Sequence, residues 1–319
     1  MKEGCAMLKT EDQLCEILSG IGYDEHEIVM MDVPGVARKA FAVEITAGEA
    51  MDLWAEFRSI SEQTGMWPVL HACWLNDAGS WREAVLNEDA FMRRPYGWEP
   101  SGADRDLSPE AICAGAAAAD IKAILASHDR LYSEDLEENF EYSLGHTKER
   151  FGKVPSLDEI NKLIAEKQIN GYFEFERWML EWEIQYSGAG DVLEPEYCDH
   201  IDWYEPQGQA QALMLLPTTK PWEALAYMHW YGAENVGSEA SIAMLRRWHD
   251  KYGAELVAHY GTMLQFNAKS GPKDIFESFE LACEQEALAP CTTALAGVLL
   301  RDHARSLMKT RRWFLHERP

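Results

Sequence analysis

Apolar positions in the first 75 residues follow two different periods, which predict different elements. Short runs that are apolar throughout or alternate with polar residues indicate strands. Three such runs are Glu27–Asp32, Lys39–Ile45 and Trp67–Leu75. Large apolar residues instead recur at helical spacing within Thr46–Gly65, which predicts a helix ended by its last glycine, and Glu11–Leu18 predicts a first helix. The order of strand, helix and strand is typical of a layered α/β arrangement.

The middle of the chain reads as mainly helical. Ser108–Pro109–Glu110 is a good helix start, with Ser as N-cap and Pro in the first helical position, and we expect that helix to run to about Ser127. Residues 128–206 then resemble a separate insertion, which contains 20 Asp/Glu against 7 Lys/Arg. Ser156 and Glu159 have the spacing of a capping box, which indicates another helix start there.

Tyr172–Tyr186 predicts an amphipathic helix. Its large apolar residues fall on one face, which favours packing on a core over an exposed aromatic stripe. These residues are Tyr172, Phe175, Met179, Trp182 and Tyr186. The acidic residues of the same segment are expected mainly on other faces. They are Glu174, Glu176, Glu181 and Glu183.

The last third combines both periods. We expect strands and a hairpin around Gly261, in the order Gln211–Leu216, Trp222–Tyr231, Ala254–Tyr260 and Thr262–Ala268. We expect helices at Ser238–Tyr252, stopped by Gly253, and at Pro272–Ala287 and Thr293–Trp313. The whole pattern predicts an α+β (mixed α/β) fold, a sheet flanked by helices, in three parts. These are an N-terminal α/β part, 1–127, the acidic helical insertion, 128–206, and a C-terminal α/β part, 207–319.

Charge changes this picture because it is segregated. The net charge is −25, yet residues 217–319 contain 12 Lys/Arg and 12 Asp/Glu, so the whole acidic excess lies before Pro217. Such a field repels nucleic acid and anionic lipid and speeds encounter with a basic partner, although acidity can also serve solubility alone. A signal peptide and an apolar spanning segment are not evident, and the seven cysteines are scattered and odd in number. These features favour a cytoplasmic protein with reduced thiols.

The sequence offers two weak sets of reactive side chains. Cys198–Asp199–His200 with Asp202 includes zinc-binding residue types but lacks a second paired motif, so a polar loop is favoured and we expect no metal. His249, Glu255 and His259 could supply a general base and an orienting carboxylate, although histidines in packed elements usually have structural roles. No nucleophile elbow, dinucleotide-binding loop or phosphate-binding loop occurs, so we expect no cofactor and no enzymatic activity.

Two segments combine aromatic residues with acids, as protein interfaces facing arginine and lysine do. They are Ser133–Tyr142 (SEDLEENFEY) and Tyr197–Glu205 (YCDHIDWYE). A solvated helix face or loop edge is the alternative for both. The predicted partner-binding residues are Glu134, Asp135, Glu137, Glu138, Glu141, Tyr197, Asp199, Asp202, Trp203, Tyr204 and Glu205.

The C-terminal third resembles the bacterial family known as domain of unknown function 4253. The resemblance rests on Pro221–Trp222, the run RRWHDKYGAELVA at Arg246–Ala258, the helix after Gly271–Pro272, and Trp313–Phe314. A weaker match is TGMWPVL at Thr64–Leu70. It covers about residues 210–319 and, more weakly, 50–75. The family often has a Gly-Trp-Asn-x-Cys-Pro-like turn before the helix, whereas the region 230–237 here (WYGAENVG) lacks the Cys-Pro pair.

Some members of this family resemble immunity proteins encoded beside secreted toxins. The resemblance therefore implies a cytoplasmic immunity protein, an antitoxin that occludes a cognate basic toxin domain of the nuclease or ADP-ribosyltransferase class. Charge would speed the encounter and aromatic anchors would slow dissociation. The alternatives are a small-molecule enzyme that uses His249, Glu255 or His259, and an acidic structural or regulatory interaction module.

Overall fold

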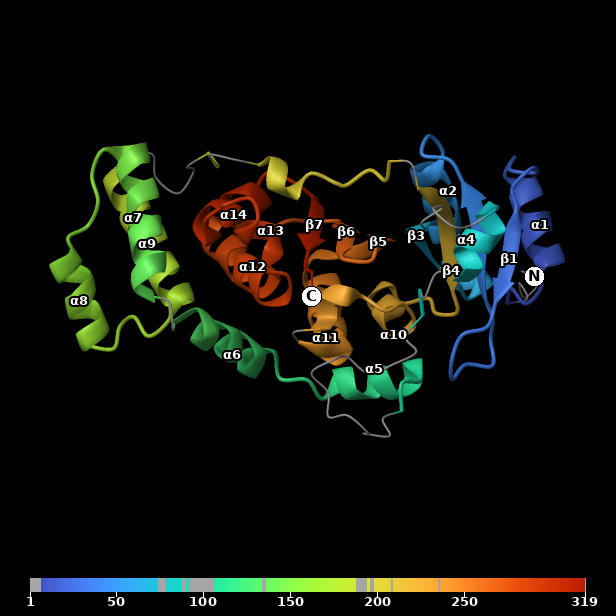
Figure 1. Cartoon of the computed structure of the whole chain (residues 1–319), viewed down its shortest axis with the longest axis horizontal. Helices are drawn as coiled ribbons and strands as arrows, with labels where there is room; N and C mark the ends of the chain where they lie inside the picture. Colours follow the sequence, from blue (N-terminus) through green and yellow to red (C-terminus); the bar gives the residue numbers. More distant parts are fainter. Residues whose placement is uncertain are drawn as a thin grey trace. The chain divides into compact units, whose positions relative to one another are not determined.

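The chain forms two compact units. The computed structural model describes residues 7–73, 79–87, 90–91, 106–133, 136–187, 194–195, 198–207, 209–234 and 236–318. The first unit comprises Met1–Ala119, Trp203–Ala268 and His316–Pro319, and the second comprises Asp120–Asp202 and Lys269–Leu315. Figure 1 shows the elements of both along the colour ramp. The second unit thus joins most of the predicted insertion to a later segment of the chain.

The sheet is mixed, with strand order β1-β2-β4-β3-β5-β6-β7. The strands are β1 (Ile28–Met31), β2 (Ala40–Ile45), β3 (Trp67–Cys73), β4 (Ala210–Leu216), β5 (Glu255–His259), β6 (Met263–Asn267) and β7 (Arg312–His316). β3 pairs with β5 in parallel, whereas β1 with β2, β2 with β4, β3 with β4 and β5 with β6 are antiparallel. The predicted strands at 27–32, 39–45 and 211–216 and the predicted hairpin are therefore confirmed. The strand predicted at 67–75 is confirmed as far as residue 73, and its last two residues lie outside the described residues.

The core of the first unit lies along β2, β4 and β3. Every residue of β4 from Ala212 to Leu216 is at most 1% exposed. Two indoles tie the neighbouring elements to β3 and β5. Trp54 Nε1 donates to the carbonyl of Pro68 at 3.0 Å, and Trp67 Nε1 donates to the carbonyl of Leu256 at 3.1 Å. A strand buried on both faces reads as a continuous apolar run, which explains why the sequence signal was clear here.

Helices of the first unit begin and end where local chemistry dictates. The α-helices are α1 (Glu11–Gly20), α2 (Ala50–Ser59), α3 (Ser61–Thr64), α4 (Trp81–Asn87), α5 (Pro109–Ala117), α10 (Ala224–Tyr227) and α11 (Gly237–Tyr252). The short 3-10 helices, labelled η, are η2 (Pro221–Glu223) and η3 (Tyr231–Glu234). The Ser108 side chain caps α5 by accepting from Ala111 N, with Pro109 next to it. Gly253 ends α11 in the left-handed conformation, with φ at 64°, as predicted.

The second unit is built from helices. They are α6 (Ile121–Ser133), α7 (Leu136–Phe151), α8 (Leu157–Ala165), α9 (Tyr172–Ser187), η1 (Asp199–Ile201), α12 (Ile275–Leu288), α13 (Cys291–Ala294) and α14 (Leu300–Leu307). Helix α14 packs against α12 and α9, and α9 also packs against α6 and α7. Ser156 caps α8 by accepting from Glu159 N at 3.1 Å, which confirms the predicted helix start.

Four predicted elements were wrong in type or extent. Trp222–Tyr231 is not a strand but η2, α10 and the start of η3, because Pro221 sets a helical first turn and the run has no period that distinguishes a helix from a strand. The helix predicted from Pro109 ends at Ala117, since Asp120 starts a new one by accepting from Lys122 N at 3.0 Å. Thr46–Gly65 likewise divides into α2 and α3 at Ile60.

The fourth is Thr293–Trp313, which contains the end of α13, all of α14 and the start of β7 rather than one helix. Gly297, at φ 64°, ends the first of these helices, and Leu299 is extended before α14 begins. With its helices and its mixed sheet the chain has an α+β fold, as the pattern predicted.

Candidate functional site

The acidic residues predicted to bind a partner fall partly in the second unit. Glu141 on α7, Asp199 on η1 and Asp202 after it are all solvent-exposed. Glu134, Asp135 and Tyr197 lie outside the described residues, and the side chains of Glu137 and Glu138 on α7 are also outside the described part. Exposure at these three carboxylates leaves them accessible to a cation, as an interface role requires.

The rest of the predicted set belongs to the first unit, where Trp203, Tyr204 and Glu205 lie beside the β5–β6 turn. The Tyr204 carbonyl accepts from the buried Gln265 Nε2 at 2.8 Å, and its ring meets that of Tyr260 edge to face at 5.7 Å. Burial raises the pKa of Tyr260, and Tyr204 and Glu205 raise it further. We call Trp203, Tyr204, Glu205 and Tyr260 the aromatic–acidic edge. Glu205 is exposed there, and the three aromatic rings are half-buried.

Glu255, a candidate orienting carboxylate, is used in an ion pair. Arg58 on α2 binds it with two hydrogen bonds, Nε to Oε2 at 2.9 Å and Nη2 to Oε1 at 2.6 Å. Glu255 is 6% exposed. A bidentate arginine fixes a carboxylate geometrically and satisfies both its oxygens. The pair therefore joins α2 to β5. It also occupies both carboxylate oxygens of Glu255, which would otherwise have to bind a histidine to orient it as a general base.

The two candidate histidines are also engaged internally. His249 Nδ1 lies 3.0 Å from the Ala254 carbonyl, which closes the turn after α11, and its ring packs on Trp222 at 4.6 Å. His259 is 1% exposed, with its ring 5.8 Å from that of His71, whose Nδ1 lies 2.8 Å from the His259 carbonyl. Burial lowers the pKa of His259 to about 3, and His71 lowers it further. A base that weak is a poor proton acceptor at neutral pH.

The Cys198–His200 segment is organised around histidine pairing in the second unit. His200 Nε2 lies 2.9 Å from His303 Nδ1, and His303 Nε2 lies 3.0 Å from Gln285 Oε1. Because an amide oxygen only accepts, His303 donates to it from Nε2 and accepts from His200 at Nδ1, so the His303 ring is neutral. Burial lowers the pKa of His200 to about 4. Cys198 Sγ contacts Ser306 Oγ at 3.7 Å, and no group of three or more His, Cys, Asp or Glu among the described residues is arranged to hold a metal.

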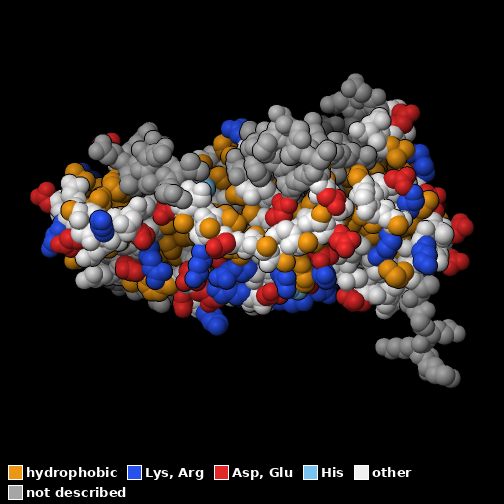
Figure 2. Space-filling view, turned by 90° about the horizontal axis from the view of Figure 1, so that it is seen from below, with side chains coloured by type: hydrophobic (Ala, Val, Ile, Leu, Met, Phe, Trp, Pro, Cys, Tyr) orange, Lys and Arg blue, Asp and Glu red, His pale blue; other side chains and the backbone are white. Residues whose placement is uncertain are grey.

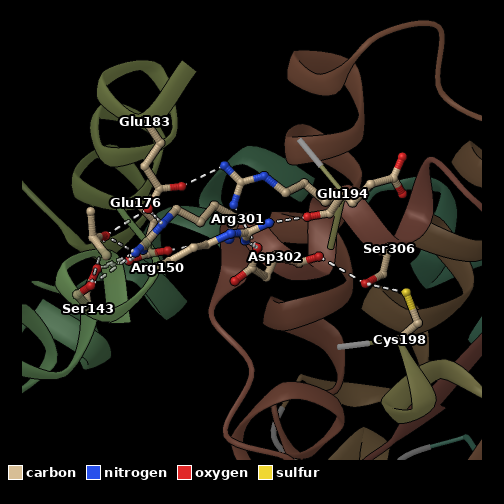
Figure 3. Close-up of polar contacts among 11 residues, drawn as sticks. Ser143, Arg150, Glu176, Glu183, Glu194, Cys198, Arg301, Asp302 and Ser306 are labelled. Atoms are coloured by element: carbon tan, nitrogen blue, oxygen red, sulfur yellow. Dashed lines mark hydrogen bonds and ion pairs between the residues drawn. The ribbon is translucent and has the colours of Figure 1, made fainter. Parts of the chain in front are cut away.

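A buried ionic network, which the sequence did not predict, organises the second unit (Figure 3). Arg301 on α14 is 1% exposed and binds Glu176 Oε1 at 2.6 Å and Glu183 Oε1 at 2.8 Å. It also donates to Ser143 and Thr147 of α7. Arg305 binds the other oxygen of Glu183 at 2.6 Å. One guanidinium therefore links α7, α9 and α14.

The network is neutral as a whole. Arg305 and Arg150 both bind Asp302 Oδ1, at 2.7 and 2.8 Å, so three arginines face three carboxylates. Burial alone raises the pKa of Glu183, but Arg301 and Arg305 outweigh it and hold that pKa below its usual value. The same balance lowers the pKa of Asp302. These charges cancel internally, so the acidic excess of the chain resides elsewhere.

Two of the four α9 glutamates, Glu174 and Glu181, are exposed as predicted, whereas the other two are not. Glu176 and Glu183 are 0% and 1% exposed, whereas Tyr186, expected in the core, is 47% exposed. A helical wheel judged by hydrophobicity alone assigns every carboxylate to solvent. Arg301 and Arg305 reverse that preference because they provide partners inside the unit. The seven-residue spacing of Glu176 and Glu183 puts both on one face, but the exposed pair Glu174 and Glu181 has the same spacing, so the local sequence does not distinguish the buried pair.

Comparison with known proteins identifies one segment of the chain. Residues 212–316 match the family described as Domain of unknown function (DUF4253). The match runs from β4 to the last residue of β7 and covers less than half of the chain. The weaker resemblance at 50–75 lies outside it. No curated protein and no solved structure matches the chain.

No single helix in the described part of the chain is long and apolar enough to cross a membrane. Among the described helices, one consecutive pair, Pro109–Ala117 and Ile121–Asp129, reaches that length and composition when the two are joined, but the helix is broken between them.

Proposed function

We propose that this protein is a cytoplasmic immunity protein that binds a cognate basic toxin domain and occludes its active site. The observation that carries the proposal is the aromatic–acidic edge, where Tyr204, between Trp203 and Glu205, is held against a buried strand. Tyr204 is anchored through its carbonyl and its ring, so the segment is ordered before a partner arrives. Preorganised aromatic groups lose little entropy on binding and are the usual anchors of interfaces.

The charge of the chain supports the same proposal. The net charge is −25. The three arginines and three carboxylates of the buried ionic network in the second unit cancel one another, so the network does not contribute to this excess. Exposed Glu141, Asp199 and Asp202 in that unit add to the acidic surface. On the face drawn in Figure 2, acidic and basic side chains are intermixed, so that face is not where a single-sign field is concentrated. A toxin that acts on nucleic acid or NAD carries a basic cleft, which such carboxylates complement.

The internal contacts weaken the enzymatic alternative. Glu255 is bound by Arg58, His249 closes a turn, and His259 is buried with a pKa of about 3. Each of the three side chains has a structural partner or a pKa unsuited to proton transfer near neutrality. Occlusion, by contrast, requires no chemistry from this chain.

The test is co-expression with the toxin domain encoded beside the gene. We expect protection of growth and a complex that survives gel filtration. Trp203→Ala should raise the dissociation rate, and Glu205→Lys should lower the association rate most strongly at low salt. The control is Asp158→Lys, which reverses an exposed carboxylate on α8, outside both segments. A gene without a toxin-like neighbour, whose loss causes no self-intoxication, would overturn the proposal.

The same variants separate the immunity role from a general interaction module. If the protein binds a basic partner that is not a toxin, and Trp203→Ala weakens that complex, then the edge is an interface but the immunity assignment is wrong. If Glu205→Lys and Asp158→Lys have equal effects on every complex, acidity acts non-specifically and serves solubility.

A further inference from the structure

The first unit contains a small hollow away from the aromatic–acidic edge. It has a volume of about 150 Å³ and is bounded by residues of α5, η2 and α11. The apolar part of its lining comes from Ala116, Ala117, Ile242 and Ala243. The polar part comes from Lys220, Glu223 and Arg246. A cavity of this order accommodates one benzene-sized group, so size alone restricts a ligand to a single ring or a short branched chain.

One wall of the hollow is the indole of Trp222, which is fixed from behind. Its ring packs on that of His249 at 4.6 Å and a tilt of 52°. His249 is in turn held by its contact to the Ala254 carbonyl at 3.0 Å. The indole is half-buried and borders the hollow. It therefore offers a flat, prepositioned apolar surface to the body of a ligand.

The charges in the lining favour an anion. Lys220 Nζ donates to Glu223 Oε1 at 2.7 Å, and Thr218 donates to the other oxygen at 2.7 Å, so that pair is satisfied and neutral. The ion pair of Arg246 with Asp250 is long, 3.9 Å, and both side chains are more than half exposed. Such a surface pair contributes little and leaves the guanidinium able to turn to a ligand.

The remaining polar group adds no negative charge. Burial raises the pKa of the Cys113 thiol to about 12, and Glu223 also raises it. The thiol is therefore protonated at neutral pH, and the lining as a whole is positive by one charge, that of Arg246. We propose that this hollow binds a small organic carboxylate with a compact apolar body. Arg246 binds the carboxylate, and Trp222, Ala116 and Ala243 contact the body.

The test is a titration of the full chain with 4-fluorobenzoate as the probe, in which binding is monitored by ¹⁹F NMR. We expect saturable binding with a dissociation constant in the millimolar range, consistent with so small a ligand. 4-Fluorobenzylamine has the same ring and the opposite charge, and we expect it not to bind. Arg246→Met should weaken benzoate binding at least about tenfold. Arg247→Met is the matched control, an exposed arginine next in the chain but absent from the lining, and should leave binding unchanged.

A second variant tests the cavity itself. Ala243→Leu fills the space with three more carbon atoms and should abolish binding, with unchanged far-UV circular dichroism showing that the fold is kept. The proposal is overturned if the benzoate does not bind, or if the amine binds as well as the acid. It is equally overturned if Arg246→Met and Arg247→Met behave alike, or if a folded Ala243→Leu protein binds the probe normally.

Discussion

Replacing Arg301 by methionine should lower the free energy of unfolding by about 3–5 kcal/mol, the cost of breaking a buried ion pair from one side. Methionine keeps most of the buried volume but removes five hydrogen bonds. Glu183 retains Arg305, whereas Glu176, at 0% exposure, loses its one salt-bridge partner among the described residues. The stranded carboxylate at Glu176 should therefore account for most of the loss.

The measurement is urea denaturation at pH 7.5, followed by far-UV circular dichroism. The matched control is Arg177→Met on α9 in the same unit, an arginine that is 44% exposed. That side chain pairs with Glu181 one turn away and lies 5.3 Å from the centre of the Phe276 ring. Surface contacts of both kinds are weak, so we expect the control to lose about 1 kcal/mol or less.

A double variant decides whether the stranded charge or the lost hydrogen bonds cause the effect. Arg301→Met combined with Glu176→Met removes the unpaired carboxylate and should regain about 1–2 kcal/mol relative to Arg301→Met alone, because an apolar pair of similar volume can replace a buried ion pair. A further loss in the double variant would contradict the reasoning. So would a loss in Arg301→Met no larger than that in the Arg177→Met control.

Two more predictions follow from single features. His259 and His200 have pKa values of about 3 and 4 in the folded chain against about 6.5 unfolded, so the unfolded chain binds protons first. Stability should be full above pH 6.5 and fall by about 1.4 kcal/mol per histidine for each pH unit below it, down toward pH 4. Urea midpoints unchanged between pH 7.5 and pH 5.5 would contradict this. Gly253→Ala should cost about 1–2 kcal/mol because Gly253 is left-handed, whereas Gly145→Ala, on the exposed face of α7, should gain about 0.5–1 kcal/mol. Calorimetry in which Gly253→Ala and Gly145→Ala change the unfolding temperature in the same direction would refute the left-handed conformation assigned to Gly253.

Short apolar runs could be located in the sequence, but the pattern could not always decide whether a run forms a strand or a helix. Strand β4 and the β5–β6 hairpin were found because apolar strands are short and bounded by Pro217 and Gly261. Residues 222–231 are also largely apolar, yet they form helical turns. An apolar run without a clear period is compatible with a strand or a helix, so the prediction of a strand here was wrong. The parallel pairing of β3 with β5 was also beyond prediction, since the two strands are separated by nearly 200 residues and nothing local specifies a neighbour.

The buried network shows why charged positions in a helix need a different interpretation from apolar ones. All eight residues of α14 are buried, yet its sequence, LRDHARSL, is typical of a polar surface helix. Arg301 and Arg305 lie four apart on one face, and Glu176 and Glu183 lie seven apart on another helix. Like charges four apart, as at Arg301 and Arg305, repel and destabilise an isolated helix. Here the two buried pairs are accommodated because they face each other and form ion pairs across the two helices. Glu174 and Glu181 on α9 are also seven residues apart and are exposed, so spacing alone does not single out the buried pair.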